Sequence, residues 1–143
     1  MTKTDLPPAS APGILEAALY AADLDAAERF YGGVLGLERV VRAGERHVFY
    51  RVGKGVLLIF NPEETVRPPG ASDLPVPPHG ATGPRHFCFA VEGAALDAWR
   101  ARLEAAGVQI ESDFNWPNGA RSIYFRDPAG NSLEMAEPRL WAR

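Results

Sequence analysis

The spacing of apolar positions changes along the chain and does so twice in the same order. Residues 14–22 form a short apolar run of strand length, and from Leu24 to Leu35 apolar side chains recur at three- and four-residue steps. The first pattern predicts a strand and the second an amphipathic helix, for which Asp23 is the expected N-cap. Three strand-like runs follow at residues 37–42, 47–52 and 56–60. Residues 14–60 are therefore predicted to fold as β-α-β-β-β.

The same unit is predicted again at residues 86–138, after a break in the pattern. Residues 61–85 contain seven prolines and several glycines, and because proline removes backbone donors we expect an irregular connector with no regular element. The second unit begins with a strand at 86–91 and a helix at 94–106, which Gly107 should end. Its remaining strands are expected at 108–111, 121–126 and 132–136. Two equivalent units within 143 residues favour one duplicated domain.

Composition and charge exclude several classes of protein. The formal net charge is −3 and the basic residues form no stripe, so nucleic acid is not an expected partner. Cys88 is the sole cysteine, which rules out an intrachain disulfide and fits a reducing compartment. No run of about 18 apolar residues predicts a membrane span. The arm at residues 1–13 is polar and proline-rich, without a signal-peptide core, and the tail is 139–143. We expect a cytoplasmic protein.

The order of elements and two local motifs resemble the vicinal oxygen chelate superfamily of glyoxalases, bleomycin-resistance proteins and dioxygenases. The stretch LYAADLDAAERFYGGVLGLE is similar to a signature of the first module of that family, and YFRDPAGNSLEM is similar to the more specific signature of the second. The resemblance implies an α+β fold in which two βαβββ modules form a cup-shaped mixed sheet with helices outside. It also implies a divalent metal ion inside the cup that polarises neighbouring oxygens of a substrate.

The resemblance places candidate metal ligands at Glu16, His86 and Glu134. Strand alternation puts His86 on one face with Cys88, and Glu134 on one face with Ser132, which we expect to be the cup side. Glu16 stands where many members carry histidine. Two carboxylates and an imidazole suit Mn, Fe, Zn, Ni or Mg better than thiophilic metals. Glu134 and Glu16 are also the candidate catalytic carboxylates.

One feature of the resemblance is incomplete in this chain. A 75-residue offset between the modules matches Glu134 with Ile59, and isoleucine cannot bind a metal. Glyoxalase I proper uses a carboxylate from each module, so that activity is doubtful. The second module also has no lysine, which makes a dedicated fosfomycin enzyme improbable.

Further residues are expected to contact the substrate. The 75-residue offset matches His47 with Ser122, and both should point into the cup. The predicted substrate-binding residues are His47, Phe49, Ser122, Tyr124, Trp116 and Arg121. Three of them have a structural alternative: a hydrogen-bonded histidine at His47, a surface ion pair at Arg121 and a loop staple at Trp116. We expect a solvated histidine at His79, the alternative being a position over the cup mouth, and a small pocket residue at Cys88 instead of a nucleophile.

Two functions are consistent with these residues. The first is a metal-dependent lyase, isomerase, transferase or ring-cleaving dioxygenase acting on a small organic molecule. The second is a metal-free binding protein of the bleomycin-resistance type, in which the aromatic residues Tyr20, Phe49, Trp116 and Tyr124 matter most and Glu16 pairs with an arginine. The resemblance implies a homodimer in both cases, with the cup formed within one chain or across the dimer.

Overall fold

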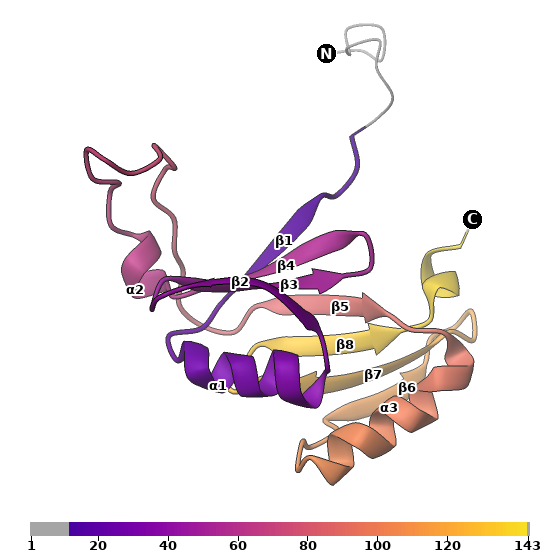
Figure 1. Cartoon of the computed structure of the whole chain (residues 1–143). Helices are drawn as coiled ribbons and strands as arrows, with labels where there is room; N and C mark the ends of the chain where they lie inside the picture. The colour runs from indigo at the N-terminus through magenta and orange to yellow at the C-terminus, as the bar shows by residue number, and fades with distance from the viewer. Residues whose placement is uncertain (1–11, 143) are drawn as a thin grey trace, which may run out of the picture.

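The chain folds into two four-stranded mixed sheets, as the computed structural model of residues 12–142 shows (Figure 1). Nearly all of the predicted arm, and Arg143 of the predicted tail, lie outside these described residues. The first sheet has the order β1-β4-β3-β2, with strands β1 (Glu16–Tyr20), β2 (Glu38–Ala43), β3 (His47–Val52) and β4 (Gly55–Phe60). The second has the order β5-β8-β7-β6, with strands β5 (His86–Ala90), β6 (Ser112–Asn115), β7 (Arg121–Arg126) and β8 (Ser132–Ala136). The predicted α+β fold of two βαβββ modules is confirmed.

Each module places its main helix against one face of its sheet. Helix α1 (Leu24–Glu28) is capped by Asp23, whose carboxylate accepts a hydrogen bond from the Ala26 amide at 3.0 Å, and the helix continues as the π-helical segment η2 (Arg29–Val34). Helix α3 (Gly93–Ala105) packs on the second sheet, and a short 3₁₀ helix, η3 (Pro138–Trp141), follows β8. In Figure 1 α1 and α3 lie on the same side of the molecule. Within the described part of the chain, every helix is too short or too polar to cross a membrane.

Two predictions of local structure are wrong. Residues 108–111 form no strand; β6 begins at Ser112, opposite Tyr124 of β7. Val108 and Ile110 are instead packed against the core as irregular chain, because apolar alternation reports burial, which does not require ladder pairing. The connector also contains a regular element, the one-turn helix α2 (Pro62–Thr65). Pro62 is tolerated there because the first residue of a helix needs no amide donor.

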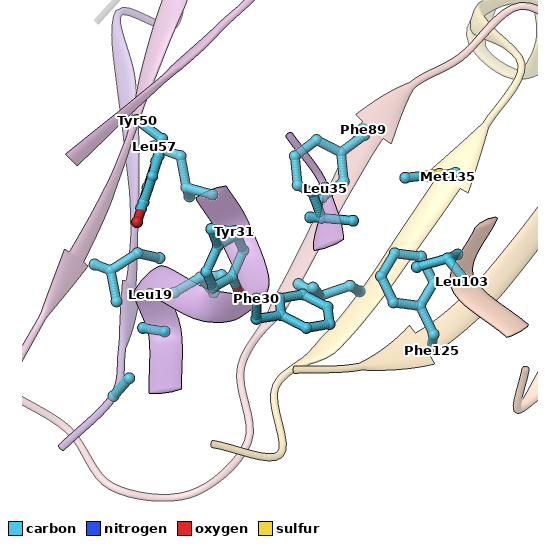
Figure 2. Close-up of a cluster of buried hydrophobic side chains, with 14 of the residues drawn as sticks. Leu19, Phe30, Tyr31, Leu35, Tyr50, Leu57, Phe89, Leu103, Phe125 and Met135 are labelled. Carbon is cyan, nitrogen blue, oxygen red and sulfur yellow. The ribbon is translucent and has the colours of Figure 1, made fainter. Parts of the chain in front are cut away.

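The two modules share one hydrophobic core (Figure 2). Phe30 projects from η2 to within 6.3 Å of the ring centre of Phe125, on β7 of the other module. The neighbouring Tyr31 donates a 2.6 Å hydrogen bond to the buried Asp127 carboxylate, which follows β7. The first helical segment therefore joins the modules, and the faces of the two sheets opposite their main helices carry most of the candidate site residues.

Candidate metal centre and substrate face

The face of the second sheet opposite α3 carries most of the predicted site. Alternation along β5, β7 and β8 places His86, Cys88, Ser122, Tyr124 and Glu134 on this one face. The residues between them on β7 and β8, such as Ile123 and Leu133, are buried in the core. The strand pairing then brings Cys88 and Tyr124 to either side of Glu134.

Glu134 is a buried carboxylate held in a fixed orientation. Its residue is only 5% exposed, and the Ser122 hydroxyl donates a 2.6 Å hydrogen bond to Oε2. The indole of Trp116 in turn donates to Ser122 Oγ at 2.8 Å. Because a buried carboxylate is costly without partners, this chain of donors stabilises one oxygen and leaves Oε1 directed elsewhere.

The imidazole of His86 directs its second nitrogen at that remaining oxygen. Nδ1 lies 2.9 Å from the Ser132 carbonyl oxygen, which only accepts, so Nδ1 carries a hydrogen. Nε2 lies 3.3 Å from Glu134 Oε1. In the neutral imidazole these two atoms are both acceptors, so the arrangement needs a proton or a metal cation between them. Ligands about 2.1 Å from a tetrahedral ion are about 3.4 Å apart, and an outer N–H bond to a carbonyl is typical of metal-binding histidine. The pair therefore fits a divalent ion.

The neighbouring Cys88 and Tyr124 are both held in their protonated forms. Although part of Cys88 is exposed, desolvation of its thiol and the Glu134 carboxylate raise its pKa to about 12. The same two causes, in the same order, raise the pKa of the Tyr124 hydroxyl to about 12. A neutral thiol is a poor nucleophile, which agrees with the interpretation of Cys88 as a pocket residue, and Tyr124 has a proton to donate.

Glu16 lies on the other sheet and is not brought to this pair. It begins β1, on the edge of the first sheet, and lines a pocket there with His47 and Phe49. Among residues 12–142, no three histidine, cysteine, aspartate or glutamate side chains are grouped so that they could hold a metal ion. In the same part of the chain Glu16 forms no ion pair with an arginine.

The strand register relates the two faces residue by residue and corrects one match. Phe49 pairs with Leu58 as Tyr124 pairs with Glu134, so Leu58 and not Ile59 is the counterpart of Glu134. A shift of one residue reverses the face, and Ile59 is fully buried in the core. The offset of 75 holds for β3 and β7 but becomes 76 for β4 and β8, because the loop before β8 is longer. The first module still lacks the second carboxylate.

Arg121 lies away from this face. Its guanidinium donates to Asp113 at 2.8 and 2.9 Å and to Asp97 of α3 at 2.7 Å. These carboxylates raise the pKa of Arg121 further above its usual range. The side chain is thus engaged on the helix side of β7, which is the surface-pair alternative, and we leave it out of the proposed site.

The sequence pattern did not single out two residues that line the first-module pocket, Arg46 and Phe60. The expectation of a solvated His79 is wrong, because His79 is half-buried and lines the same pocket, which is the alternative position over the cup mouth. His79 Nδ1 is 2.7 Å from the Tyr20 hydroxyl, and its ring contacts Phe60 edge-on at 4.6 Å. The continued alternation from Leu58 to Phe60 was an available signal for Phe60. No local pattern reports that a connector residue folds back onto a strand.

The fold and the two sheet faces agree with the comparison to known families. The sequence profile of the Glyoxalase/Bleomycin resistance protein/Dioxygenase superfamily matches residues 13–135. The chain therefore belongs to this superfamily, the class of protein that its paired modules define.

Three relatives illustrate the range of that class. The crystal structure of lactoylglutathione lyase from Agrobacterium tumefaciens is 47% identical, with a TM-score of 0.87 over 96% of this chain and 100% of that one. Metallothiol transferase FosB of Shouchella clausii (strain KSM-K16) is 29% identical over 86% of this chain and 78% of its own length. The fosfomycin resistance protein FosX from Mesorhizobium loti, at 21% identity and a TM-score of 0.60 over 87% of this chain and 91% of that one, shows the same fold.

Proposed function

We propose that the protein is a metal-dependent enzyme that uses a divalent ion to polarise neighbouring oxygens of a small organic substrate. The observation that carries this proposal is the approach of His86 Nε2 to Glu134 Oε1 at 3.3 Å. Two acceptor atoms held this close, each fixed by a hydrogen bond on its far side, suit two ligands of one cation. The relatives named for lyase and metallothiol transferase activity support the same class of chemistry.

We further propose that Glu16 supplies the third ligand from a second copy of the chain. One copy holds His86 and Glu134 on one sheet and Glu16 on the other. Strands β1 and β5 are both sheet edges, with backbone groups free to face a partner. Ile14 and Leu15, next to Glu16, are 92% and 77% exposed, and apolar side chains beside a free edge favour association. A homodimer that joins the two faces would complete one site per chain.

In this site the side chains have distinct roles. A bound divalent ion would supply Lewis acidity to two substrate oxygens. Glu134 is a ligand whose orientation Ser122 fixes, so Ser122 and Trp116 act as positioning residues. Tyr124, whose pKa is raised to about 12, keeps its proton at neutral pH and donates a hydrogen bond to a developing oxyanion. Glu16, free of ion pairs within the described residues, is the carboxylate best placed to accept a substrate proton.

The reaction type is the finer part of the proposal. The identity of 47% to a structure named lactoylglutathione lyase makes that activity the first to assay. Leu58 stands opposite Phe49, at the position of the first-module carboxylate of glyoxalase I. In this chain Glu16 would therefore have to act as the base. Thiol transfer, by analogy with the name of FosB, is the second activity to assay.

Metal uptake by protein purified without chelator tests the proposed function. We expect about one divalent ion per chain in the wild type, and affinity at least about a hundredfold lower in His86→Ala, since loss of a ligand removes a first-sphere bond. Arg121→Gln is the control, because it removes a charge from the same sheet, on the helix side of β7. A wild type that takes up none of Mn, Fe, Zn, Ni or Mg contradicts the proposal.

The alternative function is a metal-free binding protein. The aromatic lining of the first-module pocket, where Phe49 and Phe60 meet at 5.3 Å, favours it. Equilibrium dialysis separates the two functions: the binding protein retains an aromatic drug in the presence of chelator and turns over no substrate with metal.

A further inference from the structure

The face of the first sheet opposite α1 holds a pocket of about 630 Å³ that the connector, including α2, covers. Its floor is made by β3 and β4, and its far wall by Val76 and His79 of the connector. In Figure 1 the connector and α2 rise beside this sheet. Glu16 also lines the pocket. Glu16 is the proposed third metal ligand, so a substrate class inferred from this pocket rests on the proposed function.

Four rings give the pocket a wall suited to a flat molecule. His47 and Phe49 stack at 4.1 Å with an interplanar angle of 11°. Phe60 stands nearly perpendicular to this pair, at 79° to Phe49, and His79 meets Phe60 at 76°. A planar ring placed in such a corner makes face contact with one ring and edge contact with another, which are the preferred aromatic geometries.

The Arg46 guanidinium lies at the His47 end of the pocket and has no carboxylate partner among the described residues. Arg46 Nη1 donates a 2.8 Å hydrogen bond to His47 Nδ1, and its guanidinium carbon is 5.8 Å from the centre of Phe60. Within residues 12–142 Arg46 forms no ion pair. Since the bond from Arg46 makes Nδ1 an acceptor, His47 carries its hydrogen on Nε2, and burial together with Arg46 lowers the pKa of this imidazole. Both groups are donors for an anion.

Two acidic residues of the connector, Glu64 and Asp73, line the pocket, and neither is paired with Arg46. Glu64 pairs with Arg67 at 3.6 Å, and Asp73 accepts the Gly70 amide at 2.8 Å. Each is thus held by a partner within the connector. The Arg46 end of the pocket remains the end that favours a carboxylate.

The two ends of the pocket are separated by most of a strand. Glu16 and Tyr20 are four residues apart on β1, which is about 13 Å at the usual rise of a strand. Tyr20 pairs with Phe60 of β4, and Phe60 pairs with His47 of β3. Glu16 therefore lies at one end of the pocket, and His47 and Arg46 lie at the other. We propose that the substrate is an elongated aromatic carboxylic acid, with its acid group on Arg46, a ring against His47 and Phe49, and its reacting oxygens toward Glu16.

Binding of 2-naphthoate to the full chain tests this pocket, using the probe's fluorescence with and without added Zn²⁺. We expect one saturable site per chain in both conditions. Arg46→Gln should weaken binding about tenfold, because a charge-assisted bidentate contact is lost. The neutral 2-naphthamide should bind the wild type about tenfold more weakly for the same reason. Phe49→Leu, which keeps an apolar side chain, should weaken binding about fivefold.

Arg39→Gln is the matched control, since Arg39 belongs to the same sheet but pairs with Glu28 on the helix side. It should bind 2-naphthoate as the wild type does. Absence of saturable binding, or a loss below about threefold in Arg46→Gln, overturns the proposed substrate class. Naphthoate binding without metal uptake would refute the metal-dependent function and leave the pocket assignment standing. Metal uptake without naphthoate binding would refute the pocket assignment and leave the metal-dependent function standing.

Discussion

His86 Nε2 and Glu134 Oε1 face each other across 3.3 Å on two parallel strands, and each residue is held from behind, by Ser132 and by Ser122. A histidine and a carboxylate on neighbouring strands often form a simple ion pair. Here Nδ1 already donates to the Ser132 carbonyl, so Nε2 meets the Glu134 carboxylate with a second proton or a metal cation between them. The need for that cation is the basis of the first prediction.

Glu134→Gln should separate stability from metal binding. The amide can donate to His86 Nε2 and accept from Ser122, so the metal-free variant should be as stable as the wild type or more stable by about 1 kcal/mol. It should lose the metal-dependent rise in melting temperature, because a neutral amide is a weaker ligand. Calorimetry with and without Zn²⁺ measures both effects. Ser122→Ala is the comparison, and it should lower the stability of the metal-free protein. An equal metal-dependent rise in melting temperature in Glu134→Gln and in the wild type would contradict the assignment of Glu134 as a ligand.

Mixing two inactive variants tests the shared site. Glu16→Ala and His86→Ala each damage every site of their own homodimer. In a mixed dimer one site receives both defects and the other receives neither, so co-refolding should restore metal binding to about a quarter of the wild-type capacity if subunits pair at random. Mixing Glu134→Gln with His86→Ala, whose residues lie on one sheet, should restore none. Equal recovery in the two mixtures would place the ligands in a different arrangement.

The corrected register predicts opposite outcomes at adjacent positions. Leu58→Glu places a carboxylate on the open face, where the counterpart of Glu134 belongs, and should fold and bind divalent ions more tightly. Ile59→Glu places it among fully buried apolar side chains and should destabilise the protein by more than about 4 kcal/mol. Urea denaturation measures the difference. If Ile59→Glu is the better tolerated variant, the register is wrong.

The bond from Tyr31 to Asp127 joins the two modules and should contribute strongly to stability. Tyr31→Phe removes a hydrogen bond to a buried carboxylate, so we expect a loss of about 2 kcal/mol in the free energy of unfolding. Tyr50→Phe is the matched control, because its ring packs 5.9 Å from that of Tyr31 and its hydroxyl bonds to none of the described residues. Similar losses in both variants would assign the effect to ring packing.

Asp113 should make stability depend on acid pH. The Arg121 guanidinium, with a smaller contribution from Arg100, lowers the pKa of Asp113 to about 2. A carboxyl with a lowered pKa in the folded state stabilises above its unfolded pKa, and this contribution is lost as pH falls through the folded value. The wild type should therefore exceed Asp113→Asn by about 1 kcal/mol above pH 4, and the difference should vanish toward pH 2. A difference that is independent of pH would contradict this account.

The sequence by itself determined the duplicated order of strands and helices, the family, and which residues share a face. These properties are local: alternation of period two assigns His86 and Glu134 to one side of their strands, and the helical spacing from Leu24 to Leu35 assigns α1 and η2. The failure at residues 108–111 has the same origin, because the pattern reports burial and β6 pairs only from Ser112.

The tertiary structure alone decided which of these residues meet. It separated Glu16 from His86 and Glu134, replaced Ile59 by Leu58 as the counterpart of Glu134, and engaged Arg121 with carboxylates on the helix side. It also brought His79 of the connector onto Phe60. Such contacts depend on register and loop length, where one residue reverses a face, and on chain segments distant in sequence. No periodicity within a strand carries that information.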